Sequence, residues 1–476
     1  MFAWMPVLAL LASTPEDIEA SVKRFIEIFA LVEDHAADPV SAERAFYEGA
    51  IPGMMKRLDP HSAFFDPGQF DQLKELENSI RKGFGSVVSV LPGRVVVLQT
   101  LAGAPSARAG IAPGDEILAI NNIALNRLEP EQLIAVLSQA RQKPAHLVVR
   151  RYGNARLLEF TLIPEDMQAP TVERVFTLTP GVGYVRVTSF DVHTGKEIRS
   201  AIERLGGAKL KALVLDLRNN TGGVMGAALE AASLFLEPGR KLVSVKGRAA
   251  SVAKDIEVPA GQVRYEFPVA VLINGKSASA AEIVTGALQD QKRAMVLGEV
   301  SFGKGLVQSV YPLSQNTGIA LTTAFYYTPS GRSIQKPLPG SQLDAATKRE
   351  TQGGIQPDLV VYPEANSRLG MVIEATGSFT SFATSYRDRV RTIPLAFEVT
   401  PAILDEFQAY LSERQIRPAV VEWSRDREWI RSRLKQEIFN QQFGVERGDE
   451  IELERDPVVL RAREELEAAA KAAPRR

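Results

Sequence analysis

KALVLDLRNNTGGVMGAALEAASLFL, residues 211–236, indicates the fold of the central part of the chain. It opens with a continuous apolar run typical of a buried strand, turns at Gly222 and Gly223, and continues as an apolar helix. PVAVLINGKSASAAEIVTGALQDQ, residues 268–291, repeats this plan, and Ala294–Leu297 reads as the next strand. Two successive strand-helix-strand units predict an α/β core with a mainly parallel sheet.

Both turns of this predicted core carry residues suited to chemistry. Gly222, Gly223 and Ser279 each fall just past the carboxyl end of a strand, where a helix begins. Because ligands collect at this edge of a parallel sheet, we expect the two turns to face one cavity.

Ser279 has two interpretations. With Glu282 three residues later it fits the capping box that starts many helices. The same position places a hydroxyl beside unpaired helix amides, where negative charge is stabilised during acyl transfer. The Ala280 amide and an amide of Gly222 or Gly223 would then form an oxyanion hole. The glycines also fit a tight strand-to-helix turn without a catalytic role. The residues alone do not decide between cap and nucleophile for Ser279, or between turn and oxyanion hole for the glycines.

A serine nucleophile needs a base to take its proton, and a neutral lysine can serve. Lys304 follows Ser279 in the run FGKGLVQ, residues 302–308, among apolar neighbours that favour the neutral amine if they bury it. Gln308 lies four residues beyond Lys304, and its amide oxygen can orient the amine without adding charge. The alternative for Lys304 is a solvated loop tip.

The segment APSARAGIAPGDEILAIN, residues 104–121, resembles a PDZ domain, and the resemblance extends over roughly Gly83 to Ile163. It implies capture of a peptide by strand addition, with backbone amides holding a free terminal carboxylate. The carboxylate-binding loop would then contain Gly83, Phe84, Gly85 and Ser86. A PDZ domain that packs or gates without binding is the alternative.

The order of motifs along the chain resembles the carboxy-terminal processing peptidases. The motifs are the PDZ-like segment, DLRNNTGG (216–223), SASAAEI (277–283), FGKGLVQ (302–308), YTPSGR (327–332) and, earlier in the chain, LDPHS (58–62). By this resemblance Ser279 is the nucleophile, Lys304 the general base and Gln308 its orienting partner, with the oxyanion hole near Gly222 and Ala280. The implied protein is a serine endopeptidase that binds protein or peptide substrates by flexible C-termini. Thr221, Lys276 and Ala281 depart from the family pattern and affect loop shape rather than a catalytic group.

Two other functions compete with a peptidase. One is a catalytically inactive PDZ scaffold that keeps a peptidase-like sheet, and the other is an acyl-CoA enzyme of the crotonase type, whose sheet is of the same kind. The intact Ser279, Lys304 and Gln308 favour the peptidase over the scaffold, and the PDZ-like segment has no explanation in a crotonase.

The composition narrows the remaining choices. The chain has 476 residues, a formal net charge of −1 and no cysteine, so disulfides and thiolate chemistry are excluded and nucleic-acid binding has no support. The four histidines show no HExxH spacing, and we expect neither a metal nor another cofactor. We predict a helical region over 1–80, a PDZ domain over 81–165, a peptidase core with a ClpP/crotonase-like sheet over 166–365, and a helical region over 366–476.

The sequences at the two ends of the chain indicate a function less specifically than the motifs between them. Residues 1–12 are apolar but too short to span a bilayer, and we interpret them as the remnant of an export signal. The protein is then periplasmic or attached to the outer face of the inner membrane, or cytoplasmic if this stretch is not a signal. The C-terminal helices are expected to pack on the N-terminal ones or on a second copy, giving a homo-oligomer, and an adaptor protein is a further expected partner.

Overall fold

The computed structural model describes residues 14–472 apart from 39, 72, 74–81, 92, 102, 152–153, 155, 168–169, 249–252, 262–263, 342, 344–352 and 391. The chain divides into two compact units. The first contains Met1–Gln72, Gln308–Thr322 and Leu338–Arg349, and the second contains Leu73–Val307, Thr323–Pro337 and Glu350–Arg476. The apolar stretch at residues 1–12 lies outside the described residues. No described helix is both long and apolar enough to cross a bilayer.

The first unit is built from N-terminal helices and a short strand. Helix α1 begins at Pro15 because the Thr14 hydroxyl accepts the Asp17 amide at 3.2 Å and proline occupies the first turn. In β1, Ala63 pairs antiparallel with Ala320 of β18. The elements are α1 (Pro15–His35), the π-helix η1 (Arg44–Ala50), α2 (Ile51–Leu58) and β1 (Ala63–Phe65), with η3 (Ser314–Asn316) and parts of β17 (Leu306–Pro312) and β18 (Gly318–Tyr327).

The PDZ fold expected from the sequence occupies the first part of the second unit. Its sheet has the order β3-β4-β5-β7-β8, with β6 paired to β5. The strands are β3 (Ser86–Leu91), β4 (Arg94–Thr100), β5 (Glu116–Ile120), β6 (Ile123–Ala124), β7 (Ala145–Arg150) and β8 (Leu158–Leu162). Helices α4 (Pro105–Ala109) and α5 (Pro130–Ala140) complete it, while β2 (Lys82–Gly83) pairs with β9 (Glu165–Asp166) where the chain enters and leaves.

The peptidase core contains the parallel sheet predicted from its two strand-helix-strand units. Its order is β10-β11-β12-β15-β16-β19, parallel from β11 onward, and only β10 runs antiparallel to its neighbour. The strands are β10 (Val172–Thr179), β11 (Val182–Val187), β12 (Ala212–Asp216), β15 (Val269–Ile273), β16 (Ala294–Gly298) and β19 (Leu359–Val360). The remaining elements are α6 (Thr194–Arg204), η2 (Gly207–Lys209), α7 (Met225–Ser233), α8 (Ala280–Asp290), β13 (Lys241–Gly247) and β14 (Lys254–Glu257).

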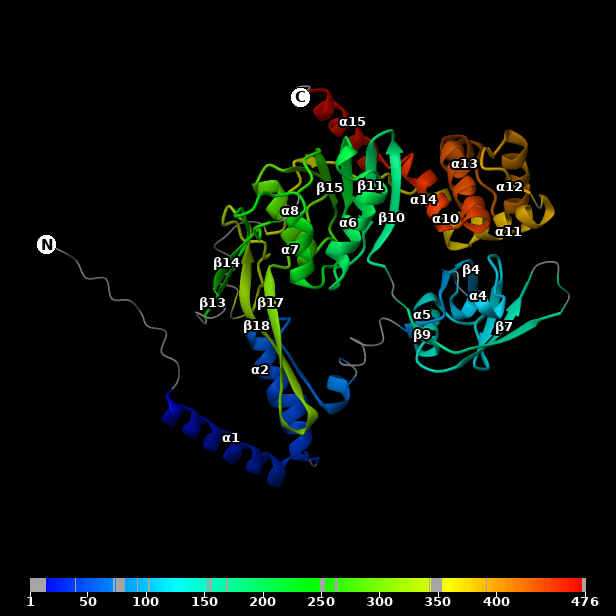
Figure 1. The fold of residues 1–476 in the computed structure, drawn as a ribbon. Helices are drawn as coiled ribbons and strands as arrows, with labels where there is room; N and C mark the ends of the chain where they lie inside the picture. The colour runs from blue at the N-terminus through cyan, green and yellow to red at the C-terminus, as the bar shows by residue number, and fades with distance from the viewer. Residues whose placement is uncertain are drawn as a thin grey trace. The chain divides into compact units, whose positions relative to one another are not determined.

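Both faces of this sheet are covered by apolar side chains. Leu213 and Leu215 of β12 point into the core shared with α6, α7 and α8, whereas Val214 points to the other face. That second face packs against α15 (Pro457–Ala472), through Val458, Val459, Ala462 and Leu466. Figure 1 shows α15 in red beside the sheet. The last helix is therefore part of the peptidase core, a partner that the sequence had not indicated for it.

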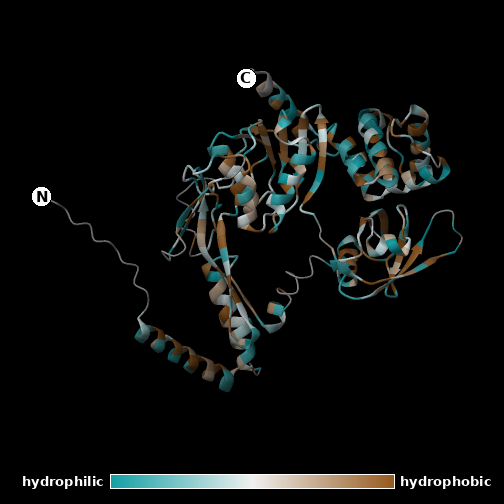
Figure 2. Ribbon diagram, viewed as in Figure 1, coloured by the Kyte–Doolittle hydropathy of each residue, from teal (hydrophilic) through white to brown (hydrophobic). Residues whose placement is uncertain are grey.

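The other C-terminal helices form a separate apolar cluster. They are α10 (Arg368–Ala375), α11 (Ser378–Val390), α12 (Pro401–Glu413), α13 (Val420–Phe443) and α14 (Val445–Leu453). Phe379, Phe407 and Ile430 are among the fully buried side chains of this cluster. Figure 2 shows the alternation of brown and teal along these helices, as expected for helices with one buried face.

Candidate active site

Ser279 stands between β15 and α8 in a strained backbone conformation. Its φ is 55° and its ψ is −114°, a region that residues other than glycine rarely occupy. Such strain persists only where the surroundings enforce it, and it clusters at functional sites. The capping box expected from the sequence is present, because Glu282 accepts the Ser279 amide, so Ser279 is the cap residue of α8 as well as the candidate nucleophile.

Glu282 joins the serine turn to the lysine loop. Its fully buried carboxylate accepts the Ser279 amide at 2.8 Å and the Lys304 amide at 2.9 Å, both through Oε2. Its Oε1 accepts the Gly303 amide at 2.7 Å and the Ser301 hydroxyl at 2.5 Å. Burial raises the pKa of Glu282, while these four donors oppose the shift. Because one oxygen atom holds both amides, the backbones of the nucleophile and base candidates are neighbours.

Lys304 lies in the loop before β17 and is half-buried, as is Ser279. Gly303 and Gly305 on either side of it are buried, so Lys304 is not an exposed loop tip. Within the described part of the chain, no hydrogen bond or ion pair links the Lys304 amine to the Ser279 hydroxyl.

Gly222 packs directly on the serine turn. A Cβ atom at Gly222 would lie 2.8 Å from the Ser279 Cβ and 3.0 Å from the Ala280 nitrogen, and its φ of 101° also requires glycine. The Gly222 amide is engaged, since it donates to Oδ1 of the buried Asn220 at 2.8 Å. Gly223 forms a parallel bridge with Phe190 that uses the Gly222 carbonyl and the Val224 amide, so the Gly223 amide is left out of that bridge.

Gln308 belongs to the first unit, whereas Lys304 belongs to the second. It is exposed on β17, and its Nε2 donates to the backbone carbonyl of His61 at 2.7 Å. His61 lies in the turn after α2.

The four residues predicted for the PDZ loop line one groove of about 270 Å³. Leu137 of α5 and Arg141, which follows α5, also line this groove. A side chain at Gly85 would collide with the Ala104 Cβ, and the φ of Gly85 is 71°, so both space and conformation demand glycine. The groove floor is apolar, with Ile111, Ile117 and Leu147. Such a groove suits an extended peptide with an apolar end.

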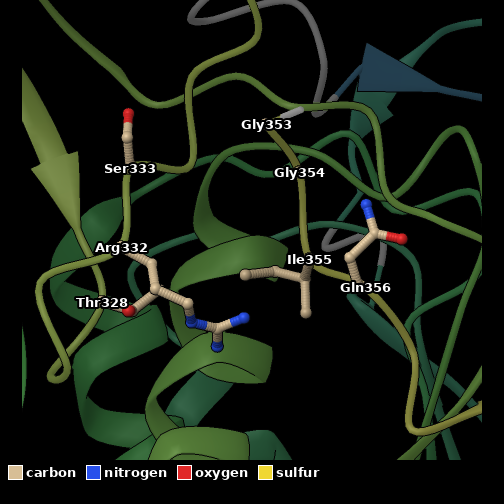
Figure 3. Close-up of a pocket in the computed structure, with 7 residues that line it drawn as sticks. All are labelled: Thr328, Arg332, Ser333, Gly353, Gly354, Ile355 and Gln356. Carbon is tan, nitrogen blue, oxygen red and sulfur yellow. The ribbon is translucent and has the colours of Figure 1, made fainter. Parts of the chain in front are cut away.

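A second cavity, of about 370 Å³, lies beside α8 (Figure 3), and its lining residues Thr328 and Ile355 are next to Gly286 of that helix. Its lining residues are Thr328, Arg332, Ser333, Gly353, Gly354, Ile355 and Gln356. The Arg332 guanidinium pairs with Asp290 at the last turn of α8. Ser279 is not one of the lining residues, so this cavity does not contain the candidate nucleophile.

The lining of that cavity still reaches the catalytic loops. The Ile355 amide donates to the Ser301 hydroxyl at 2.6 Å, and the same hydroxyl donates to Glu282. The position of the 353–356 segment is therefore coupled to the Glu282 carboxylate.

Comparison with known proteins shows the family of the chain. The sequence profile of peptidase family S41 matches residues 181–361, and a PDZ domain profile matches residues 96–151. A carboxy-terminal-processing protease of Bartonella bacilliformis is 34% identical over 316 residues, covering 66% of this chain and 72% of that protein. The chain belongs to the carboxy-terminal processing peptidases. It is thus a serine-type peptidase that acts on protein or peptide substrates.

Other proteins with processing-protease names are also similar to this chain. A carboxyl-terminal-processing protease of Synechocystis is 33% identical over 293 residues, covering 60% of this chain and 68% of that protein. Among solved structures, a photosystem II D1 C-terminal processing protease matches with a TM-score of 0.42 at 27% identity, covering 71% of this chain and 88% of that one.

The predicted site residues come together in part. The serine turn, the glycine turn and the lysine loop meet around Glu282 and Gly222. The sequence analysis missed the joining role of Glu282, the Asn220 side chain that occupies the Gly222 amide, and Ser301. Glu282 carried a signal, because the capping-box pattern marked it, but Asn220 and Ser301 carried none.

Proposed function

We propose that this serine peptidase captures the C-terminal end of a flexible protein segment in its PDZ groove and cleaves the segment upstream through Ser279 and Lys304. The observation that carries the proposal is the single Glu282 oxygen that accepts both the Ser279 and the Lys304 amides. A strained serine at a helix N-terminus, next to a half-buried lysine, is the arrangement that a Ser/Lys acyl-enzyme mechanism needs.

The proposed reaction begins when Ser279 Oγ attacks the scissile carbonyl carbon and its proton passes to the neutral Lys304 Nζ. The resulting oxyanion accepts hydrogen bonds from the Ala280 and Gly223 amides. We assign Gly223 rather than Gly222 as the second donor because Asn220 occupies the Gly222 amide. Gly222 contributes by letting the backbone approach the serine closely.

The intermediate then collapses to an acyl-enzyme on Ser279. Lys304 returns the proton to the leaving amine, and a water molecule that Lys304 deprotonates hydrolyses the ester in the second half of the reaction. Gln308 orients the Lys304 amine through its amide oxygen. An inactive scaffold is the second candidate function, and it requires that Ser279 and Lys304 be dispensable.

A single cleavage assay tests both parts of the proposal. The substrate is an unstructured peptide with an apolar C-terminal residue, offered with a free carboxylate or as the amide. We expect wild type to cleave the free form with a kcat/KM about tenfold or more above the amidated form, since loss of a charge-assisted contact costs roughly 1.5 kcal/mol or more. Ser279→Ala and Lys304→Ala should lose measurable cleavage of both. Exposed Lys254→Ala is the matched control. Wild-type turnover in the Ser279 and Lys304 variants would refute the dyad, and equal cleavage of both peptides would refute carboxylate capture.

We further propose that the protein self-associates through α1. Its apolar residues Ile18, Val22, Phe25, Phe29 and Val32 repeat at alternating intervals of four and three, the spacing of a coiled-coil seam. Export to the periplasm and delivery of substrates by an adaptor protein also remain proposals, to be tested by cell fractionation and by co-purification.

A further inference from the structure

The lysine loop packs against a second segment of the peptidase core, residues 333–336. The Lys336 amide donates to the Gly303 carbonyl at 3.1 Å. A Cβ atom at Gly305 would lie only 2.6 Å from the Gln335 nitrogen, so the two backbones are in direct contact there. Both segments belong to the second compact unit. The lysine loop therefore has a support within its own unit on the side away from Glu282 in the sequence.

The side chain of Gln335 is buried, and both ends of its amide have a partner. It is 2% exposed. Its Oε1 accepts the Gly305 amide at 2.9 Å, and its Nε2 donates to the Lys336 carbonyl at 2.8 Å. An N–H and a carbonyl need opposite ends of a glutamine amide, so this orientation is the one that satisfies both. Gly305 is itself buried, so without Gln335 its amide would lose its acceptor.

The two peptide groups that flank the Lys304 Cα are held by different side chains. Glu282 accepts the Lys304 amide at 2.9 Å, and Gln335 accepts the Gly305 amide. Because peptide groups are planar, the torsion angles φ and ψ of Lys304 are the only soft rotations between these two groups. Holding both groups therefore holds φ and ψ, and with them the direction of the Lys304 Cα–Cβ bond. Glu282 alone holds only the first of the two groups.

We propose that Gln335 is a positioning residue for the peptidase reaction: by holding the Gly305 amide it fixes the direction in which the Lys304 side chain leaves the loop. This inference rests on the proposed function of Ser279 and Lys304. A displacement of about 1 Å can cost a catalytic group roughly 100-fold in rate, so release of the Gly305 peptide group should lower kcat. Substrate capture in the PDZ groove does not involve Gln335, so KM should hardly change.

Gln335→Met tests the proposal in the full-length protein. Methionine keeps the length of the side chain but has neither the acceptor for Gly305 nor the donor for the Lys336 carbonyl. With the free-carboxylate peptide as substrate, we expect kcat to fall by roughly 10- to 100-fold and KM to stay within about twofold of wild type. Steady-state kinetics measures both, with rates divided by the folded fraction that circular dichroism gives at the assay temperature.

The matched control is Gln441→Met in α13. Gln441 is 4% exposed, its Nε2 donates to the Thr380 carbonyl at 3.1 Å and its Oε1 accepts the Thr384 hydroxyl at 3.0 Å. The substitution removes a buried amide with two partners, as Gln335→Met does, but within the helical cluster instead of beside the lysine loop. This variant should lose stability and keep the wild-type kcat. An equal fall of kcat in the two variants would overturn the proposal.

Gln335→Glu separates positioning from packing, and it still tests the proposal if Gln335→Met does not fold. A neutral carboxyl can accept from Gly305 and donate its O–H to the Lys336 carbonyl, as the amide does, whereas the ionised form has no donor. The ratio of kcat in Gln335→Glu to kcat in wild type should therefore be close to one at about pH 5 and fall toward about pH 8. A ratio that does not change with pH would contradict the proposal.

Failure of the proposed function would give a different result, because Ser279→Ala and Lys304→Ala would then keep their cleavage activity. If those two variants are inactive while Gln335→Met retains the wild-type kcat, the Ser/Lys mechanism stands and the positioning role of Gln335 is wrong.

Discussion

At the scale of single residues, Glu282 joins the serine turn to the lysine loop, a role that its capping-box pattern in the sequence does not indicate. Four donors from the serine turn and the lysine loop converge on its carboxylate, namely the Ser279, Gly303 and Lys304 amides and the Ser301 hydroxyl. Glutamine has nearly the same size, but its NH2 group cannot accept a hydrogen bond. Glu282→Gln therefore leaves two of the four donors without an acceptor and loosens the approach of the two loops.

We expect Glu282→Gln to reduce kcat/KM by roughly 10- to 100-fold, the equivalent of one or two unsatisfied buried donors at about 1–3 kcal/mol. Steady-state kinetics against the exposed substitution Glu257→Gln would measure the effect. Activity equal to that control would mean that the loops hold their positions without the carboxylate.

The raised pKa of Glu282 also predicts a pH dependence of stability. Burial raises the pKa above its ordinary value of 4.5, so the stability that this group contributes is fully present below that value and is lost as pH rises through the folded pKa. Glutamine does not titrate, so Glu282→Gln removes this contribution to the pH dependence of the unfolding free energy. Urea unfolding at about pH 5 and about pH 7 should therefore show a smaller difference in unfolding free energy than in wild type, and an unchanged difference would contradict the assignment.

The residue scale also shows how far sequence reasoning reaches. Ser279 and Lys304 were found because each sits in a motif whose chemistry can be read locally. The hydrogen bonds to the Glu282 carboxylate come in part from the Gly303 and Lys304 amides, in a loop some twenty positions later in the chain. Any residue type except proline can donate through its backbone amide, so the sequence does not indicate such bonds. Asn220 is a similar case, because an asparagine in a polar turn has many possible partners.

At the scale of elements, strands and helices of the sheet follow directly from their patterns, but the place of α15 does not. Strands β12 and β15 are continuous apolar runs, as a doubly covered parallel strand must be. Helix α15 buries Val458, Val459, Ala462 and Leu466. The same stripe would serve equally well in a helical bundle, so the sequence could not identify the sheet as its partner.

The packing of α15 gives a prediction about stability. Ala462 is fully buried against the sheet, whereas Ala468 on the same helix is exposed. Ala462→Asp should lower the unfolding free energy by about 3 kcal/mol or more, because it buries an unpaired charge. Ala468→Asp is the matched control and should stay within about 0.5 kcal/mol of wild type. Urea denaturation followed by circular dichroism measures both, and equal midpoints would show that α15 is not part of the core.

At the scale of the whole molecule, the outstanding feature is the apolar surface that α1 leaves uncovered. No residue of α1 is buried, and Ile18, Val22 and Val32 are 54, 52 and 40% exposed. Phe25 and Phe29 of the same seam contact Phe46 edge to face, so the seam is partly covered at these two residues and open at Ile18, Val22 and Val32. A continuous apolar seam of this kind is usually an interaction site, and its heptad spacing fits a second copy of the same helix.

Self-association through α1 can be tested by changing that seam. Val22→Asp should weaken the association constant by about tenfold or more, since a charge would enter a desolvated seam. Ala20→Asp, on the opposite side of the helix, should leave it unchanged. Analytical ultracentrifugation over a range of concentrations measures both. A wild-type protein that sediments as a monomer at every concentration would refute the proposal.

The packing of α15 on the central sheet also sets an order of events during translation. The ribosome makes β12 and β15 well before residues 457–472, and the helices α10 to α14 are made in between. Until then Val214, Ala270 and Leu272 have no cover on that face. The nascent polypeptide therefore completes its hydrolytic domain only after α10 to α14 have also been made, although these five helices belong to a separate apolar cluster.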